Sequence, residues 1–335
     1  MTSGNTRRIG EFEVSAISLG CMNVSHAYGI PPTPGDSARL LNEALDIGYT
    51  MLDTAALYGF GANETLLGKS ISHRRDEYVL ASKCALHGVD GKRELTNEPA
   101  KLKKSCEDSL RRLNTDVIDL FYLHRWDKVT PIEEAVGTLA DLVRDGKVRA
   151  IGLSEVSAQT LRKAHAVHPI SAVQSEYSLW TREPEIAVLD ACRELGTAFV
   201  AFSPVARGFL TGQLRDVSTL PEKDFRRNMP RFYPENYAQN LGLLDSFAAL
   251  AAEQDCSMAQ LALAWLLDID SNIVPIPGTT NPQHLVENLG AMDIVLGNSA
   301  MKAAGDIINP ATIVGDRYVP ATQAEIDTEE FPHSS

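Results

Sequence analysis

Four side chains with complementary acid–base chemistry come directly after three consecutive apolar segments. Asp53 and Tyr58 follow the first segment, Lys83 follows the second and His124 follows the third. A tyrosine has an ordinary pKa of about 10, and a neighbouring ammonium lowers that pKa because it stabilises the phenolate. We therefore expect Lys83 to lower the pKa of Tyr58 and Asp53 to keep the lysine charged. His124 is suited to orient or polarise a carbonyl oxygen, or to relay a proton.

Such a set can protonate a carbonyl oxygen while another group delivers a hydride to the carbon. Each residue also has a structural explanation of its own: Asp53 and Lys83 as an ion pair, Tyr58 as a loop aromatic. His124 alone would be a hydrogen-bonded core residue. Because four complementary groups fall on three successive segment ends, the catalytic interpretation is favoured.

These residues need a scaffold that brings successive strand ends together. Short apolar or β-branched segments alternate with longer segments of helical periodicity, as in a parallel sheet covered by helices. We predict eight strands, at Ala16–Leu19, Thr50–Leu52, Tyr78–Ala81, Val117–Tyr122, Val148–Gly152, Ala172–Val173, Ala198–Phe202 and Asn272–Pro275. The predicted helices are Asp36–Gly48, Glu98–Leu113, Pro131–Gly146, Ala158–Val167, Pro184–Leu195, Gln239–Glu253 and Met258–Leu267. Eight strand–helix units in 335 residues predict an α/β fold, the (β/α)8 TIM barrel, with a doubly wound open sheet as the alternative.

Three further features bear on the fold. The first strand runs into Gly20-Cys-Met-Asn23, so the GxGxxG fingerprint of a dinucleotide-binding open sheet is absent there. The segment Arg8–Ser15 is typical of a hairpin, which would cover the bottom of a barrel. The segment Val205–Asn236 is a long loop after the seventh strand, and loops of that length are usually functional or disordered. Without an internal repeat or linker, we expect residues 1–335 to form a single domain.

Charge and composition exclude several classes of partner. The chain has 31 Lys plus Arg against 44 Asp plus Glu, a net charge of −13 that disfavours nucleic acid and anionic lipid. No segment is apolar enough to span a membrane, and the polar start at Met1 predicts an unprocessed cytoplasmic protein. Five scattered cysteines without a CxxC pair suggest neither a disulfide framework nor a metal site.

The other strand ends carry groups suited to a dinucleotide. Ser154 and Glu155 follow the fifth strand, Gln174 the sixth, Phe202 ends the seventh, and a Gly-Thr-Thr turn follows the eighth. Such a turn before a helix favours a phosphate, because free N–H groups and the helix dipole attract anions. We expect a nicotinamide dinucleotide whose ring lies on Phe202 and whose amide reaches Ser154, Glu155 and Gln174.

The ordered motifs resemble the aldo-keto reductase superfamily over nearly the whole chain. The motifs are LDTAALYG at 52–59, TDVIDLFYLH at 115–124, GKVRAIGLS at 146–154, QSEYS at 174–178, FSP at 202–204 and IPGT at 276–279. Within it, the chain is similar to the perakine reductase and auxin-induced protein branch, as YSLW at 177–180 and RGF at 207–209 indicate. The resemblance implies that Tyr58 is the proton donor, tuned by Asp53 and Lys83, and that His124 positions the carbonyl. It implies a cofactor site made of Ser154, Glu155, Gln174, Phe202, Ser203, Pro204, Arg207, Gly208, Leu210, Ile276, Gly278, Thr279, Thr280, His284, Glu287 and Asn288.

The resemblance favours NADP(H), but the segment that would hold its 2′-phosphate departs from the family pattern. Residues 276–288 contain no Lys or Arg, and His284 stands where an arginine is common. A largely neutral histidine is a poor substitute for a cation that binds phosphate, so NAD(H) is an alternative. As a hypothesis, the Val205–Asn236 loop folds over the dinucleotide and supplies the missing cations, among them Arg226 and Arg227. A solvated loop of mixed charge is the alternative.

We therefore predict an oxidoreductase that reduces an aldehyde or ketone to an alcohol, or runs the reverse reaction. Tyr28, Trp126 and Trp180 suggest an aromatic lining and a bulky or aromatic carbonyl substrate. One alternative is a regulatory subunit that binds the nucleotide with little turnover, and another is a lyase or isomerase that binds sugar phosphates. The sequence gives neither the oligomeric state nor the direction of the reaction.

Overall fold

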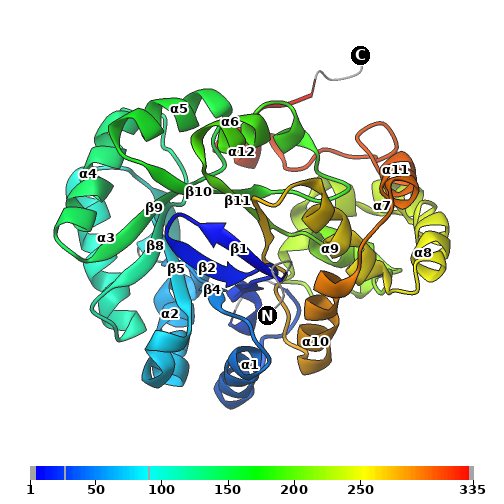
Figure 1. The fold of residues 1–335 in the computed structure, drawn as a ribbon, viewed down its shortest axis with the longest axis horizontal. Coiled ribbons are helices and arrows are strands. Elements are labelled where there is room, and N and C mark those ends of the chain that lie inside the picture. Colours follow the sequence, from blue (N-terminus) through cyan, green and yellow to red (C-terminus); the bar gives the residue numbers. More distant parts are fainter. Residues whose placement is uncertain (1–4, 26–27, 90, 332–335) are drawn as a thin grey trace.

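Eight parallel strands curl into a barrel in the computed structural model, which describes residues 5–25, 28–89 and 91–331 (Figure 1). In ring order the strands are β3 (Leu19–Gly20), β4 (Met51–Asp53), β5 (Val79–Cys84), β8 (Ile118–Leu123), β9 (Val148–Ser154), β10 (Ile170–Glu176), β11 (Ala198–Phe202) and β12 (Ile273–Pro275). The two ends of this sheet meet where Ser18 N–H donates to Pro275 O (3.0 Å) and Gly20 N–H to Pro277 O (3.3 Å). A Cβ on Gly20 would lie 2.8 Å from Ile276 O, so this junction requires glycine. The predicted (β/α)8 barrel is confirmed.

The helices cover the outside of the strands. They are α1 (Pro34–Asp46), α2 (Ala62–Ile71), α3 (Pro99–Leu113), α4 (Ile132–Arg144), α5 (Ala158–Val167), α6 (Val188–Leu195), α7 (Pro234–Leu241), α8 (Leu244–Glu253), α9 (Met258–Ile269), α10 (Pro282–Gly290), α11 (Asn298–Ile307) and α12 (Pro320–Gln323). Local capping explains several of the starts, because Thr33 accepts from Asp36 N–H at α1 and Ser257 forms a capping box at α9. The single helix predicted at 239–253 is two helices that meet near Gly242, and α2 was not predicted.

The inside of the barrel is filled with apolar side chains, and the N-terminal hairpin closes one end of it. The interior cluster includes Leu120 from β8, Val200 from β11 and Val274 from β12. Ile9 and Phe12, from the hairpin of β1 (Thr6–Ile9) and β2 (Phe12–Ser15), belong to the same cluster. The predicted hairpin is therefore confirmed, and the hairpin lies across the barrel in Figure 1. The first residues of the chain, on which the predicted unprocessed start depends, lie outside the described residues.

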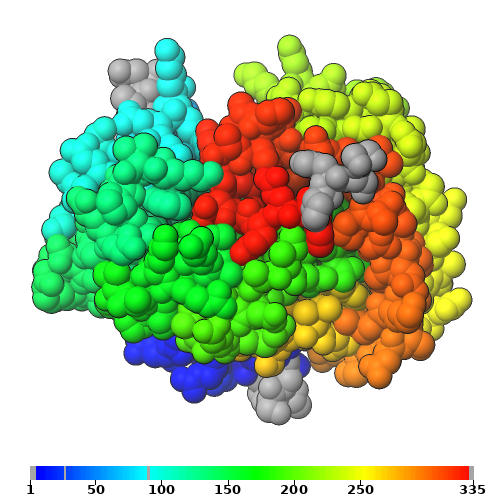
Figure 2. All heavy atoms as spheres, turned by 90° about the horizontal axis from the view of Figure 1, so that it is seen from above, coloured from blue at the N-terminus to red at the C-terminus, as the bar shows by residue number. Residues whose placement is uncertain are grey.

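Three segments surround the opposite end, where the strands finish. A second hairpin, β6 (Leu86–Val89) with β7 (Lys92–Leu95), follows β5 and was not predicted. The Val205–Asn236 segment consists of short 3-10 turns up to the start of α7. In Figure 2 the C-terminal segment, in red, lies between the cyan part of the chain that contains the second hairpin and the yellow-green part that contains the long loop. Within residues 5–25, 28–89 and 91–331, no helix is both long and apolar enough to cross a membrane.

Candidate active site

Strands β4 and β5 bring three of the predicted residues into contact. Asp53 is the last residue of β4, and Tyr58 begins the 3-10 turn after it. Lys83 is the next-to-last residue of β5. The Lys83 ammonium contacts the Asp53 carboxylate, donates to Thr54 O (2.7 Å) and lies 3.3 Å from Tyr58 Oη. Gln174 Nε2 donates to the other Asp53 oxygen (2.7 Å). Because the lysine is fully buried, its position toward the tyrosine is fixed by these contacts.

The pKa of the tyrosine differs from the expectation. Burial raises the pKa of Tyr58 above its ordinary value, and this outweighs Lys83, which acts to lower it. The prediction of a lowered pKa was therefore wrong, since the sequence showed the cation but not the burial. Burial also disfavours the Lys83 ammonium, but Asp53 and Tyr58 outweigh it and raise the pKa of the lysine. The site consequently holds a protonated phenol beside a charged ammonium at neutral pH.

His124 comes from the end of β8 and meets Tyr58 edge to face, with ring centroids 6.0 Å apart. Burial, together with Arg125 and Lys83, lowers the pKa of His124 well below its ordinary value. The imidazole is therefore neutral at physiological pH. Its Nδ1 is buried and has no hydrogen-bond partner among the described residues. A neutral ring beside a phenol can hold a carbonyl oxygen by a hydrogen bond without adding charge.

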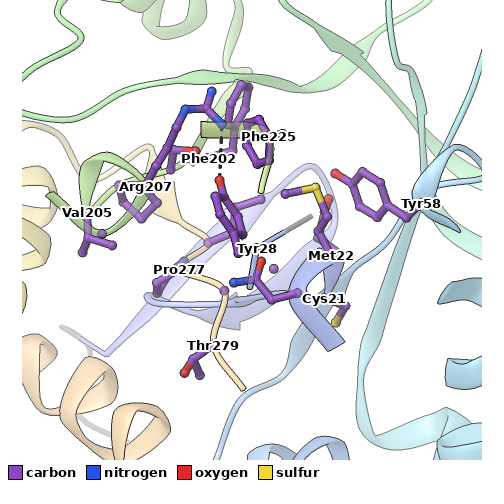
Figure 3. Close-up of a pocket in the computed structure, with 18 of the residues that line it drawn as sticks. Cys21, Met22, Tyr28, Tyr58, Phe202, Val205, Arg207, Phe225, Pro277 and Thr279 are labelled. Carbon is purple, nitrogen blue, oxygen red and sulfur yellow. Dashed lines mark hydrogen bonds between the residues drawn. The ribbon is translucent and has the colours of Figure 1, made fainter. Parts of the chain in front are cut away.

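A cavity of about 730 Å³ opens beside these residues at the carboxyl ends of the strands. Met22 and Tyr58 lie on one side of it in Figure 3, with Phe202 and Arg207 across from them. Of the predicted residues, those that line the cavity are Tyr28, Asp53, Tyr58, His124, Ser154, Gln174, Phe202, Ser203, Pro204, Arg207, Gly208, Ile276, Gly278, Thr279, Thr280 and His284. The barrel topology thus gathers residues from nearly every strand end around one space.

Four of the predicted cofactor residues do not line the cavity. Glu155 Oε1 accepts from Arg317 (2.6 Å) and from Glu176 N–H (2.9 Å), and the side chain is buried outside the cavity lining. Leu210 is fully buried in the main core, and Asn288 is buried in α10. Glu287, also on α10, is likewise absent from the lining. In each case, the position along the chain could be predicted from the sequence, but the direction of the side chain could not.

The two tryptophans predicted to contact substrate also lie elsewhere. The Trp126 indole donates to Thr130 O (2.7 Å) and packs against the core. Trp180 is 2 % exposed and stacks on Phe209 with ring centroids 4.5 Å apart, while the Arg231 guanidinium lies over its ring. Neither residue belongs to the cavity lining. Of the three predicted aromatic contacts, only Tyr28 is placed there.

The long loop and the segment that contains Tyr28 form a roof over part of the cavity. Arg207 donates to Tyr28 Oη (3.3 Å), the hydrogen bond drawn in Figure 3. Arg226 lies over the Tyr28 ring, 5.0 Å from its centroid, and pairs with Asp224 (2.7 Å). Asp224 in turn accepts from Gly29 N–H (3.1 Å). The hypothesis that this loop covers the dinucleotide stays a prediction. Arg226 lines the cavity, whereas Arg227 donates to Leu220 O and is not in the lining.

A buried ionic network connects the long loop and the C-terminal segment to the end of strand β10. Glu176, at the end of β10, accepts from Arg207 (2.5 Å) and from Arg317 of the C-terminal segment (3.0 Å). Burial raises the pKa of Glu176, but Arg207, Arg317 and Arg231 outweigh it and lower that pKa to about 2. The network could not be predicted from the QSEYS motif at 174–178, because its members are separated by up to 141 positions.

Several cavity residues were missed because they carry no motif. Arg125 lines the cavity beside His124, and Arg93 reaches it from the second hairpin. Met22 and Leu86 add apolar surface, and Thr322 comes from α12. Hairpin and C-terminal residues meet at this site through tertiary contacts, for example between Arg93 and Glu325 (2.7 Å), which leave no local pattern in the sequence.

At the β12 end of the cavity, polar groups precede helix α10. Thr279 Oγ1 lies 3.3 Å from His284 Nδ1 and accepts from Asn281 N–H (3.0 Å). Within the described residues, the amide N–H groups of Thr279 and Thr280 have no acceptor. Free amides and hydroxyls ahead of a helix suit an anion. This donor set fits a phosphate group.

The comparisons with known proteins agree with this geometry. The model of the Aldo/keto reductase family matches residues 16–309. The aldo-keto reductase yakc of Schizosaccharomyces pombe, whose name specifies NADP(+), is 42 % identical over 336 residues, covering 98 % of both chains. The structure of the glycerol dehydrogenase AKR11B4 from Gluconobacter oxydans is 30 % identical, covering 95 % of this chain and 99 % of the other, with a TM-score of 0.85. An aldo/keto reductase from Klebsiella pneumoniae, solved with NADP and acetate, is 27 % identical over 94 % of this chain and 99 % of its own, with a TM-score of 0.73. The chain belongs to the aldo/keto reductase family and is an oxidoreductase.

Proposed function

We propose that the protein reduces an aldehyde or ketone to the alcohol, or runs the reverse oxidation, with Tyr58 as the proton donor. The observation that carries the proposal is the Lys83 ammonium 3.3 Å from Tyr58 Oη, at the edge of a cavity of about 730 Å³. A phenol that stays protonated at neutral pH can give its proton to a carbonyl oxygen in the transition state. The phenolate left behind is stabilised by the adjacent ammonium, which Asp53 keeps charged.

His124 positions the carbonyl in this scheme. Its neutral ring meets Tyr58 edge to face, so both can reach one oxygen atom in the cavity. The burial of Lys83 and Asp53 excludes water from the ammonium, which strengthens its effect on the phenolate. The residues of this chain therefore supply orientation, proton donation and charge stabilisation.

A nicotinamide dinucleotide fits the remaining lining, and when bound it supplies the hydride. Ser154 Oγ accepts from Arg125 (3.0 Å), which leaves the serine proton free to be donated to a carboxamide. Phe202 offers a ring face for the nicotinamide, and the free amides of Thr279 and Thr280 suit a phosphate. We propose NADP(H) as the coenzyme, supported by relatives whose names or structures include it, with NAD(H) as the alternative.

We also propose a family branch, a domain organisation and a location for the protein. The YSLW and RGF motifs at 177–180 and 207–209 support the perakine reductase and auxin-induced protein branch. We further propose a single domain over residues 1–335 and a cytoplasmic location. We also propose a preference for bulky or aromatic carbonyl substrates. Of the three aromatic residues on which this preference was based, Tyr28 lines the cavity, whereas Trp126 and Trp180 do not.

Tyr58→Phe tests the proton donor. We expect kcat for aldehyde reduction to fall at least about a hundredfold while the dissociation constant of the coenzyme stays within about twofold, because only the hydroxyl is lost. Turnover is measured as the loss of absorbance of the reduced coenzyme, with NADPH and with NADH, over a panel of carbonyl compounds. Retained turnover in Tyr58→Phe contradicts the assignment, and no turnover by the wild type on the whole panel favours the nucleotide-binding regulatory role.

A substitution in the long loop tests the coenzyme preference. Arg207 and Arg226 are the two arginines of the long loop in the described cavity lining. If Arg226 binds the 2′-phosphate, Arg226→Ala is expected to raise KM for NADPH about tenfold more than KM for NADH. Arg227→Ala serves as the matched control, since Arg227 donates to Leu220 O outside the lining. An unchanged ratio of the two KM values in Arg226→Ala would remove the loop from coenzyme recognition.

A further inference from the structure

One cationic side chain in the cavity has no carboxylate partner in the part of the chain that the structure describes. Among the described residues, the arginines that line the cavity are Arg93, Arg125, Arg207 and Arg226. Three of them are paired: Arg93 with Glu325, Arg207 with Glu176 and Arg226 with Asp224. No Asp or Glu of the described chain forms an ion pair with Arg125. Of the four guanidinium groups in this lining, that of Arg125 is thus the one without a carboxylate partner among the described residues.

The guanidinium of Arg125 is held in place but only partly used. One terminal nitrogen donates to His124 O (2.6 Å) and to Ser154 Oγ (3.0 Å). The remaining N–H groups, on Nε and on the second terminal nitrogen, have no acceptor in the part of the chain that the structure describes. These nitrogens are not fully buried, and Arg125 lines the cavity. An accessible, pre-oriented guanidinium edge matches the two oxygens of a carboxylate.

The position of Arg125 separates it from the proposed phosphate sites. Arg125 follows β8, whereas Thr279 and His284 follow β12, and in the closed ring β8 and β12 are opposite one another. Arg207 and Arg226 belong to the loop after β11, three strands away from β8. The coenzyme phosphates therefore have their own donors on the far side of the cavity. Arg125 instead flanks His124, at the end where the carbonyl is reduced.

Apolar side chains accompany this charge. Met22, Leu57 and Leu86 line the same cavity, and Met22 lies beside Tyr58 in Figure 3. A substrate with an apolar skeleton would cover these side chains while its carbonyl reaches Tyr58 and His124. We infer that Arg125 binds an anionic group of the substrate, so that the enzyme prefers aldehydes or ketones that also carry a carboxylate. This inference rests on the proposed carbonyl reduction and names its substrate class.

Matched pairs of carboxylic acids and methyl esters test the inference. The substrates are the ortho, meta and para carboxybenzaldehydes and 4-oxobutanoate, each against its methyl ester, with kcat and KM measured separately. In the wild type, we expect at least one acid to exceed its ester about tenfold or more in kcat/KM, as one charge-assisted contact would give. That advantage should decrease as salt is added, because screening weakens the ion pair.

Variants of Arg125 locate the source of the preference. Arg125→Met should raise KM for the preferred acid at least about tenfold more than KM for its ester, so that the acid-to-ester ratio of kcat/KM falls toward one. Arg125→Lys should retain part of the acid preference, since it keeps a charge but loses the planar fork. Arg93→Met is the matched comparison, because Arg93 lines the same cavity but is already paired with Glu325, so the acid-to-ester ratio should be unchanged.

Two results would overturn the inference. The first is a wild type that prefers the ester in every pair. The second is an equal fall for acid and ester in Arg125→Met, which would mean that Arg125 acts by supporting His124 and Ser154. If the wild type reduces neither acids nor esters with either coenzyme, the proposed function itself fails, and this result differs from both of the others.

Discussion

The Glu176 carboxylate provides the sharpest stability prediction, because it joins the end of β10 to both the loop arginine Arg207 and the C-terminal Arg317. Its folded pKa is about 2 against an ordinary value of 4.5, so its ionisation favours the folded state. A pKa that is depressed on folding contributes stability above the unfolded value, and this contribution is lost as the pH falls toward the folded value. The difference corresponds to about 3 kcal/mol of unfolding free energy at neutral pH.

We expect Glu176→Gln to lower the free energy of unfolding by about 3 kcal/mol at pH 7, since it also leaves two buried guanidinium groups with fewer carboxylates. The gap between wild type and variant should narrow to about 2 kcal/mol at pH ~3.5, where the wild-type carboxylate is largely protonated in the unfolded state but still ionised in the folded state. Urea unfolding followed by the fluorescence of Trp180 and Trp265, both buried, measures the gap at each pH.

The matched control is Glu194→Gln, which removes a carboxylate from an exposed pair with Arg162. This change should leave the urea midpoint within experimental error at both pH values, because exposed pairs contribute little. Two results would contradict a stabilising role for this network. One is a Glu176→Gln variant as stable as the wild type at pH 7, and the other is a difference in unfolding free energy that does not narrow in acid.

Two further predictions concern the catalytic group. Lys83→Met leaves the buried Asp53 carboxylate without its cation, so we expect the free energy of unfolding to fall by about 3–5 kcal/mol and kcat to fall at least about a hundredfold. Denaturant titration and steady-state kinetics check both, and a fully active variant would exclude Lys83 from the chemistry. Because burial holds the pKa of His124 well below its ordinary value of 6.5, we expect the pH profile of kcat/KM to be flat between about pH 6 and 8. A decrease with a midpoint near 6.5 that His124→Gln abolishes would contradict the neutral imidazole.

Periodicity and motif order were sufficient to predict the barrel. Alternating apolar and amphipathic segments determine strands and helices locally, and eight such units leave few ways to close a sheet. The contact of Lys83 with Asp53 and Tyr58 followed from the same logic, because residues at adjacent parallel strand ends must lie together. The local errors, such as the helix divided near Gly242, occurred where helical periodicity continues across a turn.

Side-chain direction and burial could not be predicted in this way. Glu155 follows a strand as Ser154 does, yet it pairs with Arg317, which is 162 positions away in the chain. Burial reversed the expected direction of the Tyr58 pKa shift, since desolvation depends on everything packed around a group. Likewise, the sequence places Arg125 beside His124, but only the assembled ring shows that its neighbours leave its charge unpaired.

The sequence by itself determined the order of strands and helices, the barrel and the residue types at each strand end, because these depend on local periodicity. The tertiary structure decided which of those side chains share the cavity, which charges are neutralised and which pKa values shift. The physical reason is that electrostatic energies depend on distance and burial in space, and contacts such as Glu176 with Arg317 join residues far apart in the chain.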